Sequence, residues 1–72
     1  MQYELFSDVF CYADGKYYFI LILKDQKTNI EIDSTVIGPY SFKTMALKAS
    51  HVAKKHVAKE LVNAGHIVLV RN

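Results

Sequence analysis

An uninterrupted apolar run, Tyr17 to Leu23, constrains the fold more than any other feature of the sequence. The run falls well short of the roughly 18 residues that a membrane-spanning helix needs. Read as a β-strand, it is apolar on both faces: Tyr17, Phe19, Leu21 and Leu23 against Tyr18, Ile20 and Ile22. A strand of this kind belongs inside a sheet whose two faces both meet apolar groups.

The segments on either side of this run predict two more strands. Residues 2–13 are rich in β-branched and aromatic types, and Asp14-Gly15 separates them from the run at 17–24. An Asp-Gly pair in this position is typical of a tight hairpin turn, which needs positive φ. After a polar turn at 24–29, residues 30–37 alternate as a half-exposed edge strand does, and Gly38-Pro39 ends the sheet segment.

Residues 42–63 predict one long helix, because they are rich in alanine, leucine and lysine and contain no glycine or proline. Ser41 is placed to cap its start, and Gly65 to end it. At about 100° per residue, the apolar residues share one face. The residues on this face are Phe42, Met45, Ala46, Ala49, Ala53, Val57 and Leu61, and we expect those from Met45 onward to be buried against the sheet. A short strand at 67–70 follows.

The predicted order is therefore β-β-β-α-β, an α+β fold in which one long helix packs on one face of an antiparallel sheet. With 72 residues, the chain has room for one domain, 1–72, and not for two. Cys11 is the only cysteine, so no disulfide forms within the chain, and we expect it to be a small buried side chain. A single thiol and an N-terminus, MQYELFSD, without a signal-peptide pattern predict a cytoplasmic location.

The sequence contains no recognisable catalytic or metal-binding motif. His51 and His56 lie five residues apart, about 140° around the predicted helix, whereas helical pairs that share a metal are three or four apart. Cys11, Ser41 and Ser50 stand in no nucleophile elbow or cysteine–histidine signature, and no glycine-rich phosphate loop is present. We therefore predict a non-enzymatic protein with no catalytic residue, no metal and no cofactor.

Charge is divided unevenly along the chain. Residues 1–37 carry six carboxylates and three lysines, net −3, whereas residues 38–72 carry six cations and one carboxylate, net +5. Cations form a stripe along the predicted helix opposite its apolar face, with Lys54 at the side. Such a stripe can neutralise successive phosphates, and it is also the ordinary composition of a solvated helix face. The candidate anion or nucleic-acid contacts are Lys43, Lys48, His51, Lys55 and Lys59.

A three-stranded sheet followed by a helix that opens SFKTMALKASHVAKK is similar to the second half of a double-stranded-RNA-binding domain. Ser41, Lys43, Ala46 and Ala49 match that pattern loosely. The resemblance implies phosphate contacts by lysines at the start of the helix. The first helix of that family and its adjacent lysine pair are missing here, and a fourth strand is added, so we do not assign the chain to the family.

One helix covers only one face of a four-stranded sheet, which leaves the apolar residues of the second face for a subunit, a partner or a ligand. The candidate interface residues are Phe6, Phe10, Tyr12 and Tyr18. The strand register decides which residues share that face, since a slip of one residue inverts it. The leading interpretation is a homodimeric protein-binding adaptor or inhibitor, and a chain of this size would be unsurprising in a phage or mobile element. The alternative is a nucleic-acid-binding module that uses the basic helix face.

Overall fold

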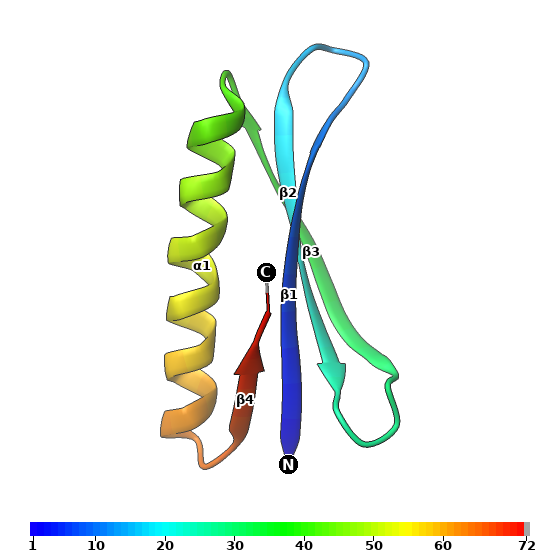
Figure 1. Cartoon of the computed structure of the whole chain (residues 1–72), viewed down its shortest axis with the longest axis vertical. Helices are drawn as coiled ribbons and strands as arrows, with labels where there is room; N and C mark the ends of the chain where they lie inside the picture. Colours follow the sequence, from blue (N-terminus) through cyan, green and yellow to red (C-terminus); the bar gives the residue numbers. More distant parts are fainter. Residues whose placement is uncertain (72) are drawn as a thin grey trace.

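The computed structural model describes residues 1–71 as a four-stranded sheet with one helix along one of its faces (Figure 1). The elements, in chain order, are β1 Gln2–Cys11, β2 Tyr17–Asp25, β3 Glu31–Tyr40, α1 Lys43–Asn63 and β4 Ile67–Val70. Across the sheet the strands follow the order β3-β2-β1-β4. The predicted α+β class and the predicted order of elements are confirmed.

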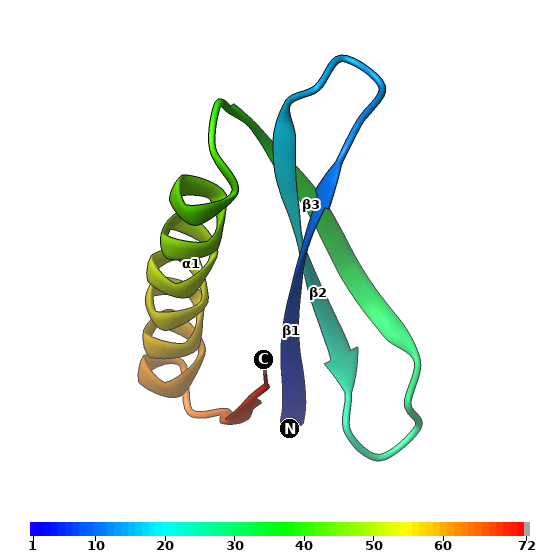
Figure 2. The ribbon, with the colours of Figure 1, turned by 45° about the horizontal axis from the view of Figure 1, so that its top comes forward.

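The first three strands form the predicted antiparallel arrangement, and β4 then joins β1 in parallel. The reason is the path of the chain. Helix α1 carries it from the end of β3 back to the end of the sheet where β1 begins, so β4 enters beside β1 and runs in the same direction (Figures 1 and 2). The sheet is therefore mixed, where the sequence predicted antiparallel pairing throughout.

The register settles which side chains share each face. Leu5 pairs with Leu23, and Val9 with Phe19. Leu5 and Phe19 are each 1% exposed, and Leu5 lines a small pocket together with Val57 of α1. The odd-numbered residues of β1 and β2 therefore point toward α1, and the even-numbered residues point away from it.

Helix α1 buries most of the predicted face, but it is rotated so that Ser50 and Lys54 are buried as well. Its buried residues are Ala46, Ser50 and Lys54. Phe42 is 65% exposed and Met45 is 49% exposed. The prediction of burial was wrong for Met45, whereas the other residues predicted to be buried are buried or half-buried: Ala46, Ala49, Ala53, Val57 and Leu61.

The small residues of α1 explain this rotation. Ala46 and Ser50 are four residues apart and lie one above the other on the helix, so the first half of α1 approaches the sheet on a narrow stripe. The Ser50 hydroxyl donates to the Leu47 carbonyl at 2.7 Å, which satisfies it without a partner on the sheet. Lys54, four residues after Ser50, lies on the same stripe and is therefore buried between the helix and the sheet.

The predicted C-terminal end of α1 is confirmed, whereas the predicted cap at its N-terminal end is not. Phe42, not Ser41, occupies the N-cap position, and no side chain caps the helix start. At the other end, the Gly65 amide donates to the Val62 carbonyl and the His66 amide to the Leu61 carbonyl. This pair of hydrogen bonds is a Schellman motif, and Gly65 adopts the positive φ of 92° that the motif favours.

Cys11 is exposed, contrary to the prediction that it would be buried. It is the last residue of β1, next to the turn into β2. Because this end of the strand lies away from the buried centre at Leu5 and Phe19, a side chain on the helix side of the sheet remains in contact with water.

Gly38 and Gly15 both require positive φ, at 154° and 76°, but only Gly38 is sterically confined. A Cβ added to Gly38 would lie 2.5 Å from Tyr18 Cδ2, whereas nothing lies within 4 Å of a Cβ added to Gly15. We expect Gly38→Ala to lower the free energy of unfolding by about 2–3 kcal/mol and Gly15→Ala by about 1 kcal/mol. Urea denaturation of the two variants measures both values, and equal losses would contradict the contact with Tyr18.

Candidate interaction surfaces

All four predicted interface residues lie on the sheet face that points away from α1. Phe6 pairs with Ile22 and Phe10 with Tyr18, so the four strand positions share one side. Among the described residues, no helix or loop covers this side (Figure 2). We call it the open face, and its apolar members are Phe6, Phe10, Tyr12, Tyr18, Ile20, Ile22, Ile32 and Val36.

Three aromatic rings form a cluster at one end of the open face. The ring centroids of Phe10 and Tyr12 are 5.0 Å apart, those of Tyr12 and Tyr18 are 4.7 Å apart, and those of Phe10 and Tyr18 are 6.0 Å apart. Tyr12 is nevertheless 52% exposed. Because the rings already hold one another in place, little side-chain freedom remains to be lost when a partner covers them.

Asp14 anchors this cluster from the β1–β2 turn. The Tyr18 hydroxyl donates to Asp14 Oδ2 at 2.9 Å, and the Lys16 amide donates to Asp14 Oδ1 at 2.8 Å. The Lys16 amide holds the pKa of the Asp14 carboxyl below its ordinary value of 3.8, and the bond to Asp14 raises the pKa of Tyr18 above 10.0. Since the pKa of Asp14 is lowered by folding, its stabilising effect is present above about pH 4 and is lost as the pH falls through the folded value.

The other end of the open face is aliphatic and carries a cation. Val36 is 48% exposed and Ile32 is 49% exposed. The Lys24 ammonium lies 5.3 Å from the centroid of the Phe6 ring, a cation–π contact. The open face is thus apolar along the middle of β2, with Lys24 toward one end, Asp14 at the other, and the exposed Asp8 between Phe6 and Phe10 on β1.

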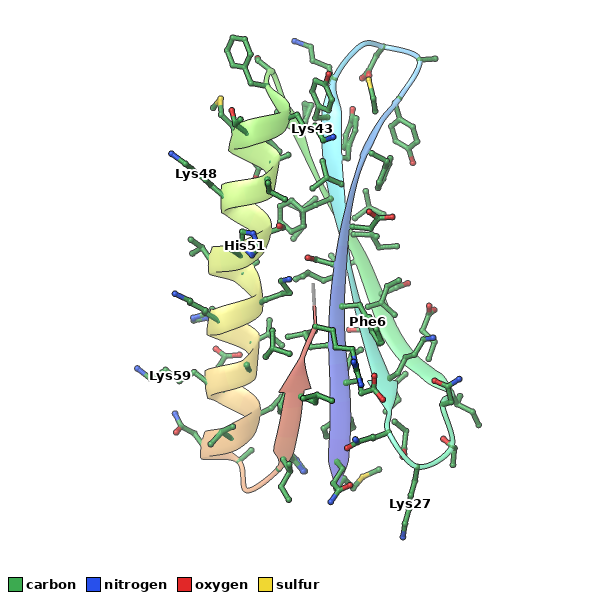
Figure 3. The ribbon with its side chains drawn as sticks, viewed as in Figure 1. Phe6, Lys27, Lys43, Lys48, His51 and Lys59 are labelled. Atoms are coloured by element: carbon green, nitrogen blue, oxygen red, sulfur yellow. The ribbon has the colours of Figure 1, made fainter. Side chains whose placement is uncertain are left out.

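The predicted basic stripe divides between two surfaces. Lys48, Lys55 and Lys59 are exposed, and Figure 3 shows Lys48 and Lys59 projecting away from the sheet. Lys43 instead points toward the strands (Figure 3). Lys54, predicted at the side of the stripe, is only 2% exposed. The helix therefore turns lysines both to solvent and to the sheet.

A pocket of about 260 Å³ lies between the first half of α1 and the second half of β1. We call it the β1–α1 groove, and it is lined by Ser7, Asp8, Val9, Lys43, Leu47, His51 and Lys54. Sequence reasoning named Lys43 and His51 but did not place them together in a groove. No local sequence signal places them there, because nothing in the sequence distinguishes the buried Lys54 from the exposed Lys55.

Within residues 1–71, no group of three or more histidine, cysteine, aspartate or glutamate side chains is placed to hold a metal ion. No helix in the same range combines the length and the apolar character needed to cross a membrane. A scan of protein-family models gives no match, and searches of curated proteins and of solved structures give no significant match. A function must therefore be argued from the surfaces themselves.

Proposed function

We propose that the protein is a non-enzymatic protein-binding module that acts as a homodimer, with the open face of one copy packed on the open face of another. The observation that supports this is the register, which gathers the aromatic cluster and the aliphatic residues on one uncovered side of the sheet. Contiguous apolar patches of this kind on small proteins mark interaction sites.

A second copy fits the open face because the face is complementary to itself. A two-fold axis that lies in the interface and crosses the strands near Ile20 would reverse the strand direction in the partner. Lys24 of each protomer would then face the partner's Asp14, and the apolar middle of each β2 strand would face its own counterpart. The two sheets would form a sandwich about 10 Å thick.

The burial term is large enough to drive this association. If each protomer loses about 400 Å² of apolar surface to the interface, burial contributes about 20 kcal/mol at 25 cal/mol per Å². The lost translational and rotational freedom opposes this with about 4–15 kcal/mol. The balance favours the dimer at micromolar concentrations, and a charge introduced into the aromatic cluster reverses it.

The test is the mass in solution of Phe10→Asp and of a matched control, Val52→Asp. Phe10 lies in the aromatic cluster, whereas Val52 is 68% exposed on α1. Size exclusion with light scattering should give the wild type twice the 8.2 kDa of one chain. Phe10→Asp should elute as a folded monomer, and Val52→Asp should remain a dimer. A Phe10→Asp protein that stays dimeric would rule out the open face as the interface.

The outer lysines of α1 support a second candidate, nucleic-acid binding. Glu60 is the only carboxylate on the helix, and it pairs with His56 at 3.0 Å, so Lys48, Lys55 and Lys59 face solvent without a helical counter-charge. Replacing all three with glutamine should reduce the slope of log affinity against log salt by up to about three phosphate contacts. Absence of any DNA or RNA binding by the wild type at about 50 mM salt would exclude this function.

A further inference from the structure

Strand β1 is paired along only part of one edge. It runs from Gln2 to Cys11, but β4 pairs with Gln2–Leu5 alone. The Leu5 carbonyl accepts the last of these backbone hydrogen bonds, from the Arg71 amide at 2.9 Å. Among the described residues, no strand lies beside Ser7–Cys11 on that edge.

The backbone groups along this free edge point into the β1–α1 groove. The carbonyls of Met1 and Leu5 accept bonds from the β4 side, whereas the Gln2 carbonyl and the Tyr12 amide bond on the β2 side. By this alternation, the amides and carbonyls of Ser7, Val9 and Cys11 face the side that β4 has left. The Val9 amide is held by the adjacent Asp8 carboxylate at 3.0 Å, a local bond that an added strand would replace.

A hydrogen bond from Lys54 replaces the next backbone hydrogen bond between β4 and β1, and the β1 edge beyond it is left unpaired. In a continued parallel ladder, the Arg71 carbonyl would accept a hydrogen bond from the Ser7 amide. Instead it accepts one from Lys54 Nζ at 3.0 Å. An ammonium has three protons to donate, so the groove floor carries a buried cation that can take further acceptors.

The groove is cationic overall. Lys43, His51 and Lys54 line its helix side, and Asp8 is its single carboxylate. The start of α1 adds to this, because its first turn contains no acidic residue and no side chain caps it. The uncapped amides and the positive end of the helix dipole favour negative charge at the same end of the groove.

We propose that the β1–α1 groove binds an extended acidic peptide segment of a partner protein, which adds to the sheet as a strand beside Ser7–Cys11. Backbone hydrogen bonds to the free edge would align the segment, and carboxylates on its helix side would meet Lys43 and Lys54. The helix from Lys43 to Lys54 and an extended segment of about five residues both span about 16 Å. This site is separate from the open face and goes beyond the proposed dimer.

A peptide fits the groove better than a nucleic acid does. The free edge offers amides and carbonyls alternately, and only another peptide backbone presents the matching alternate groups. The phosphates of a nucleic acid are acceptors only, and they would leave the carbonyls of Ser7 and Val9 without donors. Lysines of the outer helix face, which suit phosphates, lie outside the groove.

The probe is a fluorescent peptide of about seven residues with alternating valine and glutamate, long enough to fill the groove. Two matched peptides are its controls, one with lysine in place of glutamate and one N-methylated at every residue, which keeps the charges but loses all the backbone donors. Fluorescence anisotropy should show saturable binding of the first peptide only. Equal binding of the N-methylated peptide, or no binding of the unmodified acidic peptide, would overturn the proposal.

Amide hydrogen exchange locates the bound peptide. At a peptide concentration ten times the Kd, exchange at Ser7 and Val9 should slow by about tenfold. Exchange at Phe6 and Asp8, whose amides face β2, should not change. Slowing confined to the outer face of α1 would place the peptide elsewhere and overturn the proposal.

Two charge reversals separate this groove from the other surfaces. Lys43→Glu, inside the groove, should weaken peptide binding by about tenfold, and Lys48→Glu, on the outer face, should leave it within about twofold. Phe10→Asp should bind the peptide as the wild type does, because the open face does not take part. A single-stranded RNA that binds in a Lys43-dependent manner, when the peptide does not bind, would assign the groove to nucleic acid instead.

Discussion

Phe19→Ala is expected to lower the free energy of unfolding by about 3–5 kcal/mol, the usual loss for a phenylalanine removed from a core. Phe19 is 1% exposed at the centre of β2. It pairs with Val9 and Ile37 on the neighbouring strands, and its ring centroid lies 6.0 Å from that of Tyr40. A domain of this size has only about 5–10 kcal/mol of total stability, so this loss is between about a third and all of it.

Phe42→Ala is the control for Phe19→Ala. The sequence pattern placed Phe42 on the apolar face of the helix, but the structure leaves it 65% exposed at the N-cap position. We expect this variant to lose less than about 1 kcal/mol. Urea denaturation followed by circular dichroism measures both variants. A loss at Phe42 as large as that at Phe19 would show that the helix start packs on the sheet.

Lys54→Glu is expected to destabilise the fold by about 3–5 kcal/mol, whereas Lys55→Glu should change stability by less than about 0.5 kcal/mol. The two lysines are neighbours on α1, yet Lys54 is 2% exposed and Lys55 is exposed. Glutamate at position 54 would lose the hydrogen bond to the Arg71 carbonyl and bring a carboxylate against that carbonyl oxygen. A buried charge without a donor is costly, and a solvated one is not.

Thermal denaturation of the two variants side by side measures this difference. For a domain of this size, a loss of 3 kcal/mol lowers the Tm by more than about 12 °C. Lys54→Met serves as a second control, because it keeps the side-chain volume and removes the charge, and it should be much less damaging than Lys54→Glu. Similar losses for Lys54→Glu and Lys55→Glu would mean that Lys54 is not held beneath the helix.

The elements that sequence reasoning predicted correctly are those with local signals. Asp14-Gly15 marked the first hairpin, and Gly65 marked the end of the helix, because positive φ at a turn or helix end restricts the choice of residue. The aromatic residues of the open face were also grouped correctly. Phe6 and Phe10 alternate with Leu5 and Val9 along β1, so any extended strand separates the two sets.

The features that sequence reasoning missed depend on packing between distant segments. Nothing local distinguishes Lys54 from Lys55, and alanines on several sides of α1 leave its rotation undetermined. Parallel pairing of β4 with β1 follows from the path of the helix and not from the composition of residues 67–70. The β1–α1 groove depends on both the pairing of β4 and the rotation of the helix. It requires a short β4 and a helix rotated to bring Lys43 and Lys54 toward β1.

The two proposed surfaces can operate together. The open face and the β1–α1 groove lie on different sides of the sheet, so a dimer formed through the first would leave two copies of the second accessible. A bivalent protein of this kind could bind two peptide segments of one partner, and linking them would strengthen binding without any new contact. Dimerisation through the open face is the central claim, because it sets how the grooves are displayed.

The most direct test of that claim is an isotope-filtered NOE experiment on an equal mixture of labelled and unlabelled protein, which detects only contacts between different chains. Dimerisation through the open face predicts NOEs between the side chains of Phe10, Tyr18 or Ile20 in one chain and open-face side chains of the other. A contradictory result is the absence of such NOEs in a sample whose mass is that of one chain. Intermolecular NOEs that map to α1 alone would contradict the claim equally.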